Sequence, residues 1–120
     1  MTPFAIAGIQ MNLAHHANVE AMRHRIDLTL HLYPWVQMVM FSELAPFGPL
    51  LHHAQPLPGA IEQEFQAMAR HHKIWLVNGS MCERREGGIY NTTSIINPEG
   101  EVVGRYAKMF PFTPLEQGVQ

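Results

Sequence analysis

The sequence of 120 residues predicts an α/β fold. In its first part, short apolar runs typical of buried strands alternate with segments whose apolar residues repeat every three or four positions, as in helices that cover a sheet. In its last part, three apolar runs are joined by short turns, which favours antiparallel pairing. The predicted order is β-α-β-α-β-β-β, and the first strands are expected to be parallel and joined by crossovers.

The first predicted unit is a strand, a helix and a strand. Phe4 to Gln10 is short and apolar, which suits a buried strand. Asn18 is a suitable N-cap for a helix that continues to about Tyr33 and stops at Pro34. Val36 to Phe41 is a continuous apolar run, typical of a strand buried on both faces. The helix carries one apolar stripe, made of Val19, Met22, Ile26, Leu30 and Tyr33.

The second unit starts with a helix predicted from about Ala60 to His72. A third strand is predicted at Ile74 to Ser80, with an extension as far as Cys82, and the charged segment Glu83 to Gly88 is predicted to be a turn. The inner stripe of the helix is expected to contain Ile61, Phe65, Met68 and Ala69. The last two predicted strands are Ile89 to Ile96 and Val102 to Tyr106.

Composition favours one domain over residues 1–120 and excludes several classes of protein. Apolar residues make up 47% and charged residues 15%, so the chain is predicted to be neither disordered nor a charged tail. The net charge is -2 without a Lys/Arg cluster, which argues against nucleic acid as a partner. No apolar run approaches the roughly 20 residues that span a bilayer, and the N-terminus does not resemble a signal peptide. The single cysteine fits a reducing compartment, so a cytoplasmic location is expected.

Two residues have surroundings that favour chemistry. Glu43 directly follows a predicted strand among apolar neighbours, and ligand sites of open α/β sheets form beyond the carboxyl ends of strands. Lys108 follows the last predicted strand and enters a loop rich in Phe and Pro, where an ammonium group loses hydration. The residues alone leave the alternatives open: a strand-end glutamate paired with an arginine, and a lysine whose stem covers apolar surface.

Three segments resemble the nitrilase, or carbon–nitrogen hydrolase, superfamily: AIAGIQMN, VQMVMFSELAPFG and YNTTSIINPEGEVVGRYAKMFPF. They occur in the order of that family and together cover essentially the whole chain. The resemblance implies the N-terminal half of an α-β-β-α sandwich that hydrolyses non-peptide carbon–nitrogen bonds in small amides, nitriles or carbamoyl compounds. It also implies an enzyme without a cofactor that forms a homodimer or a larger assembly.

The resemblance also implies site residues. Glu43 corresponds to the general base of a Glu-Lys-Cys triad, and Lys108 to the lysine that stabilises the tetrahedral intermediate. Glu116, eight residues after that lysine, matches an additional glutamate often found beside the triad. These residue types suit the reaction, because a thiolate that attacks a carbonyl carbon creates negative charge that a fixed cation stabilises.

The nucleophile of this pattern is not found at its expected place. In the family the cysteine follows the lysine by a few tens of residues, whereas this sequence ends at Gln120. Cys82 precedes the last two strands and is expected to be a small buried apolar residue. The chain is therefore expected to be an incomplete hydrolase domain, inactive alone, with an unpaired edge or a bare apolar sheet face. The alternative is a truncated or split fragment that acts as a non-catalytic interaction module.

Other functions have weaker support. A flavodoxin-like binding domain is disfavoured because GIQMNLAHHAN, after the first strand, contains no glycine-rich phosphate turn. Eight histidines include three adjacent pairs, but adjacent side chains point apart, so no metal site is predicted. Asn91, Thr92 and Thr93 are either polar pocket groups or ordinary strand residues.

Overall fold

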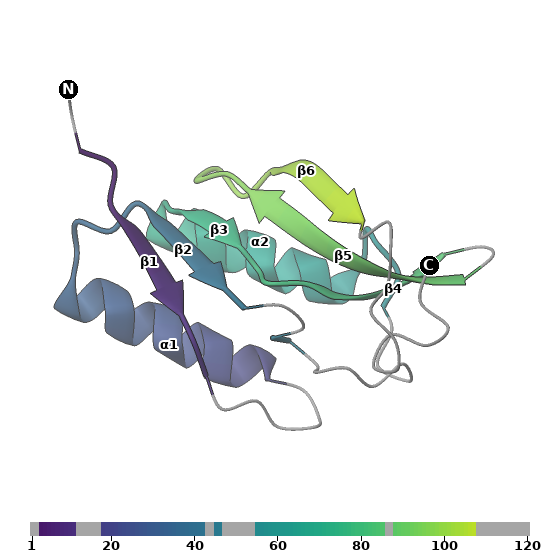
Figure 1. Ribbon diagram of the computed structural model, residues 1–120. Helices are drawn as coiled ribbons and strands as arrows, with labels where there is room; N and C mark the ends of the chain where they lie inside the picture. The colour runs from purple at the N-terminus through teal and green to yellow at the C-terminus, as the bar shows by residue number, and fades with distance from the viewer. Residues whose placement is uncertain (1–2, 12–17, 43–44, 47–54, 86–87, 108–120) are drawn as a thin grey trace.

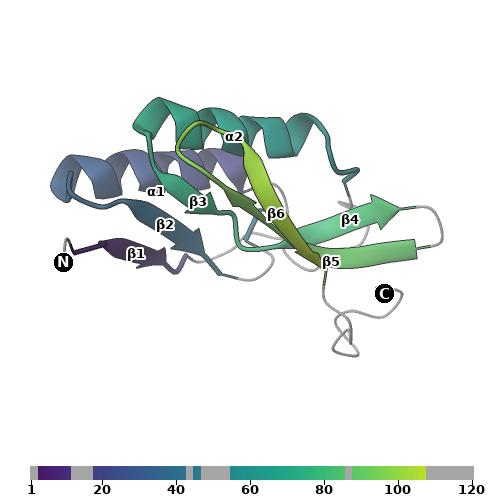
Figure 2. The ribbon, with the colours of Figure 1, turned by 90° about the horizontal axis from the view of Figure 1, so that it is seen from above.

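The described part of the chain forms a single mixed sheet of six strands, with two helices packed on one of its faces (Figures 1 and 2). The computed structural model describes residues 3–11, 18–42, 45–46, 55–85 and 88–107. Its elements are β1 (Ile6–Ile9), α1 (Val19–Leu32), β2 (Met38–Phe41), α2 (Ala60–His72), β3 (Trp75–Val77), β4 (Met81–Arg85), β5 (Gly88–Ile96) and β6 (Val102–Ala107). Neither helix of this described part has the length and apolar character that a membrane crossing requires.

The predicted α/β class, the parallel crossovers and the antiparallel last strands are confirmed. Strands β1, β2 and β3 are parallel neighbours, and β5 runs antiparallel to β3. The long strand β5 pairs along one edge with β3 and then β4, and along its other edge with β6. The chain thus has the α/β half-sandwich arrangement that the sequence predicts.

The third predicted strand is wrong in one respect, because it is two strands instead of one. Gly79 has a φ of 79°, a left-handed conformation that breaks the strand between β3 and β4. The segment predicted as a charged turn therefore begins as β4, which extends to Arg85. Its charges are accommodated in the sheet: Glu83 accepts a hydrogen bond from Thr92 Oγ1 at 2.7 Å and pairs with Arg85 at 2.9 Å.

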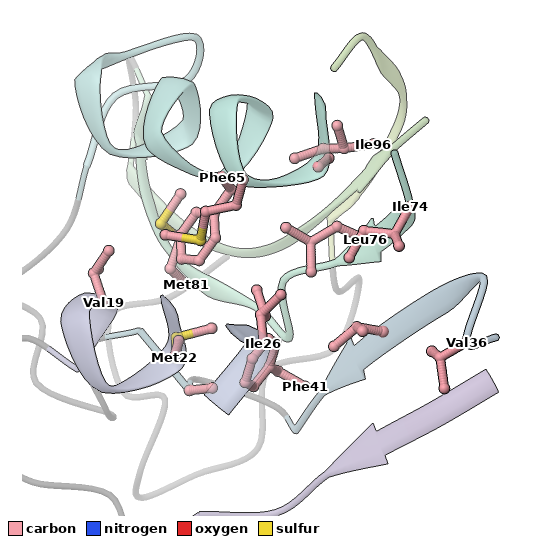
Figure 3. Packing of buried hydrophobic residues seen from close by; sticks show 14 residues of the cluster. Val19, Met22, Ile26, Val36, Phe41, Phe65, Ile74, Leu76, Met81 and Ile96 are labelled. Carbon is pink, nitrogen blue, oxygen red and sulfur yellow. The ribbon is translucent and has the colours of Figure 1, made fainter. Parts of the chain in front are cut away.

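The core lies between the two helices and one face of the sheet (Figure 3). Met22 and Ile26 of α1 and Phe65 of α2 are fully buried. They belong to the same core cluster as Leu76 of β3 and Ile96 of β5 (Figure 3). Burying apolar side chains of this size stabilises a fold by roughly 1.5 to 3 kcal/mol each. Val19, Met68 and Ala69 are buried as well, so most of the predicted inner stripes of the two helices face the core.

One predicted member of the stripes lies outside its helix, and two others, Leu30 and Ile61, pack against the core but are only partly buried. Tyr33 lies beyond the last residue of α1 and is half exposed, because the helix ends at Leu32. Ile61 is only partly buried, whereas its neighbour Glu62 is fully buried. The inner face of α2 therefore carries a carboxylate among its apolar side chains.

Neither of the two described helices lies on the opposite face of the sheet (Figure 2). Register places Ile6, Met40 and Val77 on this face, since Val39 and Leu76 point into the core. Ile6 is 56% exposed and Met40 is 39% exposed. We call this surface the open face, and it agrees with the bare apolar sheet face expected from the sequence.

Candidate functional site

Two strands that precede predicted site residues end at the same edge of the sheet. β6 is antiparallel to β5, which is antiparallel to β3, so β6 runs in the same direction as β2 and β3. The arrowheads of β2 and β6 accordingly point the same way in Figure 1, opposite to that of β5. The chain therefore leaves β2 at Phe41 and β6 at Ala107 toward one common edge.

A cavity of about 520 Å³ opens at this edge. It is lined by Met40, Phe41, Val77, Gly79, Ser80, Asn91, Thr93 and Tyr106. These residues come from β2, β5 and β6 and from the end of β3 and the break that follows it. Most of the lining is apolar, with a few polar groups, as in sites for small organic ligands.

Gly79 lines this cavity at a position where a residue with a side chain would not fit. A Cβ atom at this position would lie 2.1 Å from the backbone oxygen of Ser42, and the φ of 79° also disfavours other residues. Ser42 directly follows β2, so the strand break brings the segment after β3 against the end of β2. The sequence signal was a glycine inside a predicted strand, which is typical of close backbone approach.

The predicted site residues Glu43, Lys108 and Glu116 lie outside the described residues. Described residues precede Glu43 and Lys108 in the chain, and two of these line the same cavity. Phe41, at the end of β2, is two residues before Glu43, and Tyr106 of β6 is two residues before Lys108. The expectation that the three side chains cluster stays a prediction.

The polar residues at the start of the hairpin divide between the two faces of the sheet. Asn91 and Thr93 line the cavity, in line with a role as pocket groups. Thr92 points the other way and donates its hydroxyl to Glu83 on the helix side. Cys82 of β4 is buried and lies opposite Asn91 in the register of the β4–β5 pair. This agrees with its expected character as a small buried residue.

A buried polar cluster under α2 was not expected from the sequence. The fully buried Glu62 carboxylate accepts hydrogen bonds from Arg105 Nε at 2.8 Å and from Ser94 Oγ at 2.6 Å, and from Arg105 Nη2 as well. Burial alone raises the pKa of Glu62, but the hydrogen bonds from Arg105 and Ser94 outweigh it and hold the pKa below its usual value. The same hydrogen bond raises the pKa of Arg105. Both groups are therefore charged near neutral pH.

Two weak signals in the sequence pointed to this cluster. Glu62 is three residues before Phe65 and seven before Ala69, which places it on the inner stripe of the helix. Arg105 is the one charged residue of β6. Neither signal identifies the other as its partner, because 43 positions separate them.

One histidine of the described part forms a polar contact between the two helices. His72 Nε2 lies 2.7 Å from Asp27 Oδ1, which joins the outer faces of α2 and α1. Among the described residues, no group of three or more His, Cys, Asp or Glu side chains has a metal-binding arrangement. Two of the three histidine pairs, at residues 15–16 and 52–53, lie outside the described ranges.

A comparison with protein-family models matches residues 5–120 to the carbon-nitrogen hydrolase family. The chain belongs to this family. The match covers nearly all of the sequence, including the strands that border the cavity. The resemblance stated from the three sequence segments is thereby confirmed.

Relatives that the chain resembles include an omega-amidase and a formamidase. The chain is 26% identical over 116 residues to the human omega-amidase NIT2, covering 93% of this chain and 42% of that protein. It is 34% identical over 110 residues to a formamidase of Helicobacter acinonychis (strain Sheeba), covering 82% of this chain and 32% of the relative. The chain thus spans less than half the length of these relatives.

Solved structures show the same fold. An amidase of the nitrilase superfamily from Nesterenkonia AN1 superimposes with a TM-score of 0.81 at 19% identity, over 97% of this chain and 47% of that one. Another structure of the Nesterenkonia amidase, a mutant with the acetamide moiety of fluoroacetamide added covalently at its active-site cysteine, has a TM-score of 0.77 at 21% identity. It covers 97% of this chain and 46% of the amidase.

Proposed function

We propose that this chain forms the glutamate- and lysine-bearing part of an enzyme that hydrolyses a small amide by a Glu-Lys-Cys mechanism. Glu43 acts as the general base, Lys108 stabilises the tetrahedral intermediate, and Glu116 keeps the lysine charged and oriented. The nucleophilic cysteine comes from outside these 120 residues. Membership of the carbon-nitrogen hydrolase family and similarity to amidases support amide hydrolysis as the reaction class.

The observation that carries the proposal is the shared edge of the sheet. Because β2 and β6 run in the same direction, the segments that contain Glu43 and Lys108 leave the sheet on the same side. Phe41 and Tyr106, each two residues earlier, line one cavity of about 520 Å³. A base and a cation that follow two strands ending at one cavity are the minimum that the reaction needs from this chain.

The chemical steps follow from the roles of these groups. Glu43 takes the thiol proton, the thiolate attacks the amide carbon, and the charge on the oxygen is stabilised by Lys108. The proton passes from Glu43 to the departing nitrogen, which leaves as ammonia and a thioester remains. Glu43 then removes a proton from water, which attacks the thioester carbon. The carbon–sulfur bond breaks, the carboxylic acid is released, and Glu43 returns the proton to the departing thiolate. The sum is amide plus water to carboxylic acid plus ammonia.

The substrate is proposed to be small. Most of the cavity lining is apolar, and Asn91, Thr93 and Ser80 supply the few polar groups that can orient an amide. Formamide and a terminal aliphatic amide are suitable probes, since the relatives are a formamidase and an omega-amidase. We further propose that the enzyme is cytoplasmic, needs no cofactor and forms homo-oligomers.

Ammonia release from these amides, and from a nitrile, tests the proposal in the protein that carries this chain. Glu43→Gln and Lys108→Met are expected to reduce kcat by at least about a thousandfold, since each removes a group that acts in the transition state. Cys82→Ser is the matched control and is expected to retain activity. Fluoroacetamide should label a cysteine other than Cys82, detected by peptide mass spectrometry.

Two results would contradict the proposal. One is full amide hydrolysis by the Glu43→Gln variant. The other is absence of hydrolysis and of fluoroacetamide labelling in the unaltered protein, which would favour the interaction-module alternative. The exposed apolar residues of the open face, Ile6 and Met40 among them, are the feature that such a module would use.

A further inference from the structure

Helix α2 holds the β5–β6 hairpin at two separate points. Near the turn, Gln66 Nε2 donates to the backbone oxygen of Gly100 at 2.9 Å. Along the strands, the Glu62 carboxylate accepts hydrogen bonds from Arg105 of β6 and Ser94 of β5. These two residues lie opposite each other in the sheet. The hairpin is therefore fixed to the helix by hydrogen bonds as well as by apolar packing.

The contact at Glu62 is the stronger of the two. Its carboxylate is fully buried and binds both Nε and Nη2 of Arg105, an arrangement that fixes the direction of the guanidinium plane. Ser94 extends the contact across the sheet, because its backbone N–H donates to Asn78 Oδ1 at the end of β3. One carboxylate thus links α2, β5 and β6, and through Ser94 also β3.

The position of this contact along β6 gives it a second consequence. Arg105 lies two residues before the end of the strand at Ala107, and Lys108 is the next residue in the sequence. Tyr106, between them, lines the cavity from the opposite face of the strand. The end of β6, which precedes the proposed catalytic lysine, is thus fixed on its helix side by the Arg105–Glu62 pair.

We propose that Glu62 is a positioning residue, which acts through Arg105 to fix the end of β6 relative to the cavity. The proposal rests on the proposed function, since it concerns the presentation of Lys108. Glu62 touches neither substrate nor the reacting groups in this scheme. Its effect is expected on the chemical step, because small displacements of a catalytic group reduce the rate more than they reduce binding.

The test compares Glu62→Gln with two control variants in the protein that carries this chain. Glu64→Gln alters the exposed carboxylate of the same helix that faces Arg23, and Gln66→Ala removes the contact near the turn. With an amide that the unaltered protein hydrolyses, Glu62→Gln is expected to lower kcat about ten- to a hundredfold with little change in KM. Both controls are expected to stay within about twofold of the unaltered kcat.

Folding is measured beside activity by circular dichroism at the assay temperature. A fall in kcat with a fully folded population supports positioning, whereas a fall that only follows the loss of folded protein overturns it. An unchanged kcat in folded Glu62→Gln also overturns it. If that variant does not fold, Arg105→Lys and Ser94→Ala decide: a lower kcat in folded protein supports the proposal, and an unchanged kcat in both overturns it.

The two proposals fail in different ways. An unaltered protein without amide hydrolysis contradicts the proposed function and the positioning role with it. An active unaltered protein whose Glu62→Gln and Arg105→Lys variants keep their kcat contradicts the positioning role alone.

Discussion

The two faces of the sheet differ in how deeply their side chains are buried and in what those side chains contact. On the helix-covered face, Phe65, Leu76 and Ile96 are fully buried, and the fully buried carboxylate of Glu62 is bound by an arginine and a serine. On the open face, Met40 and Tyr106 are 39% and 65% exposed and border the cavity. The covered face therefore carries most of the stability of the described part, while the open face carries the surface where chemistry is proposed.

This difference shows how one sheet can separate stability from function. Side chains alternate between the two faces along each strand, so neighbouring residues of β5 and β6 have different surroundings and different roles. Thr92 and Arg105 bind partners on the helix side, whereas Thr93 and Tyr106 line the cavity. Substitutions on the two faces of the sheet are expected to have different consequences, and four predictions test this.

The largest effect on stability is expected from Phe65→Ala. Phe65 is fully buried between α2 and the sheet, so its removal loses apolar burial and leaves a cavity. The free energy of unfolding should fall by about 3 to 5 kcal/mol, measured by urea denaturation of the protein that carries this chain. A loss below about 1 kcal/mol would mean that the covered face is not the main core.

Glu62→Gln is expected to have the next largest effect. Removing the charge leaves Arg105 with a neutral partner, and the cost is moderated because the Arg105 side chain is 33% exposed. We expect a loss of about 2 to 3 kcal/mol, somewhat less than for a fully buried pair. Denaturation of Glu64→Gln provides the comparison: its carboxylate is 3.5 Å from Arg23 and its side chain is 41% exposed, so a change within about 0.5 kcal/mol is expected.

The same pair predicts how stability depends on pH. The pKa of Glu62 is lower in the folded protein than its ordinary value of 4.5, so the unfolded chain takes up the proton first as pH falls. The contribution of Glu62 to stability is complete above that ordinary value and is lost as pH falls through the folded pKa. Urea denaturation between neutral pH and about pH 3 should show a smaller acid loss in Glu62→Gln than in the unaltered protein. Equal slopes would contradict the assignment.

The smallest effect is expected for Met40→Ala on the open face. In a protein of these 120 residues alone, Met40 is partly exposed, and its truncation should cost about 1 kcal/mol or less. In a longer protein where the proposed sandwich covers this face, the same variant should cost about 2 kcal/mol or more. Equal costs in both would indicate that the open face stays uncovered, which would count against the sandwich.

Local patterns in the sequence determined the fold class and the family. The three- and four-residue spacing in α1 and α2, the apolar runs of β1 and β2 and the short turn before β6 depend on neighbours along the chain, so they could be predicted. The break at Gly79 and the burial of Glu62 could not, because each depends on a contact with a distant segment: the end of β2 for Gly79, and β6 for Glu62.

The candidate site divides in the same way. The sequence by itself indicated Glu43, Lys108 and Glu116 and supplied the chemical reason for their residue types. Only the tertiary structure decided that β2 and β6 end at one edge and that Phe41 and Tyr106 line one cavity. The physical reason is that strand direction and pairing are set by packing and hydrogen bonds between segments far apart in the chain, which local periodicity does not encode.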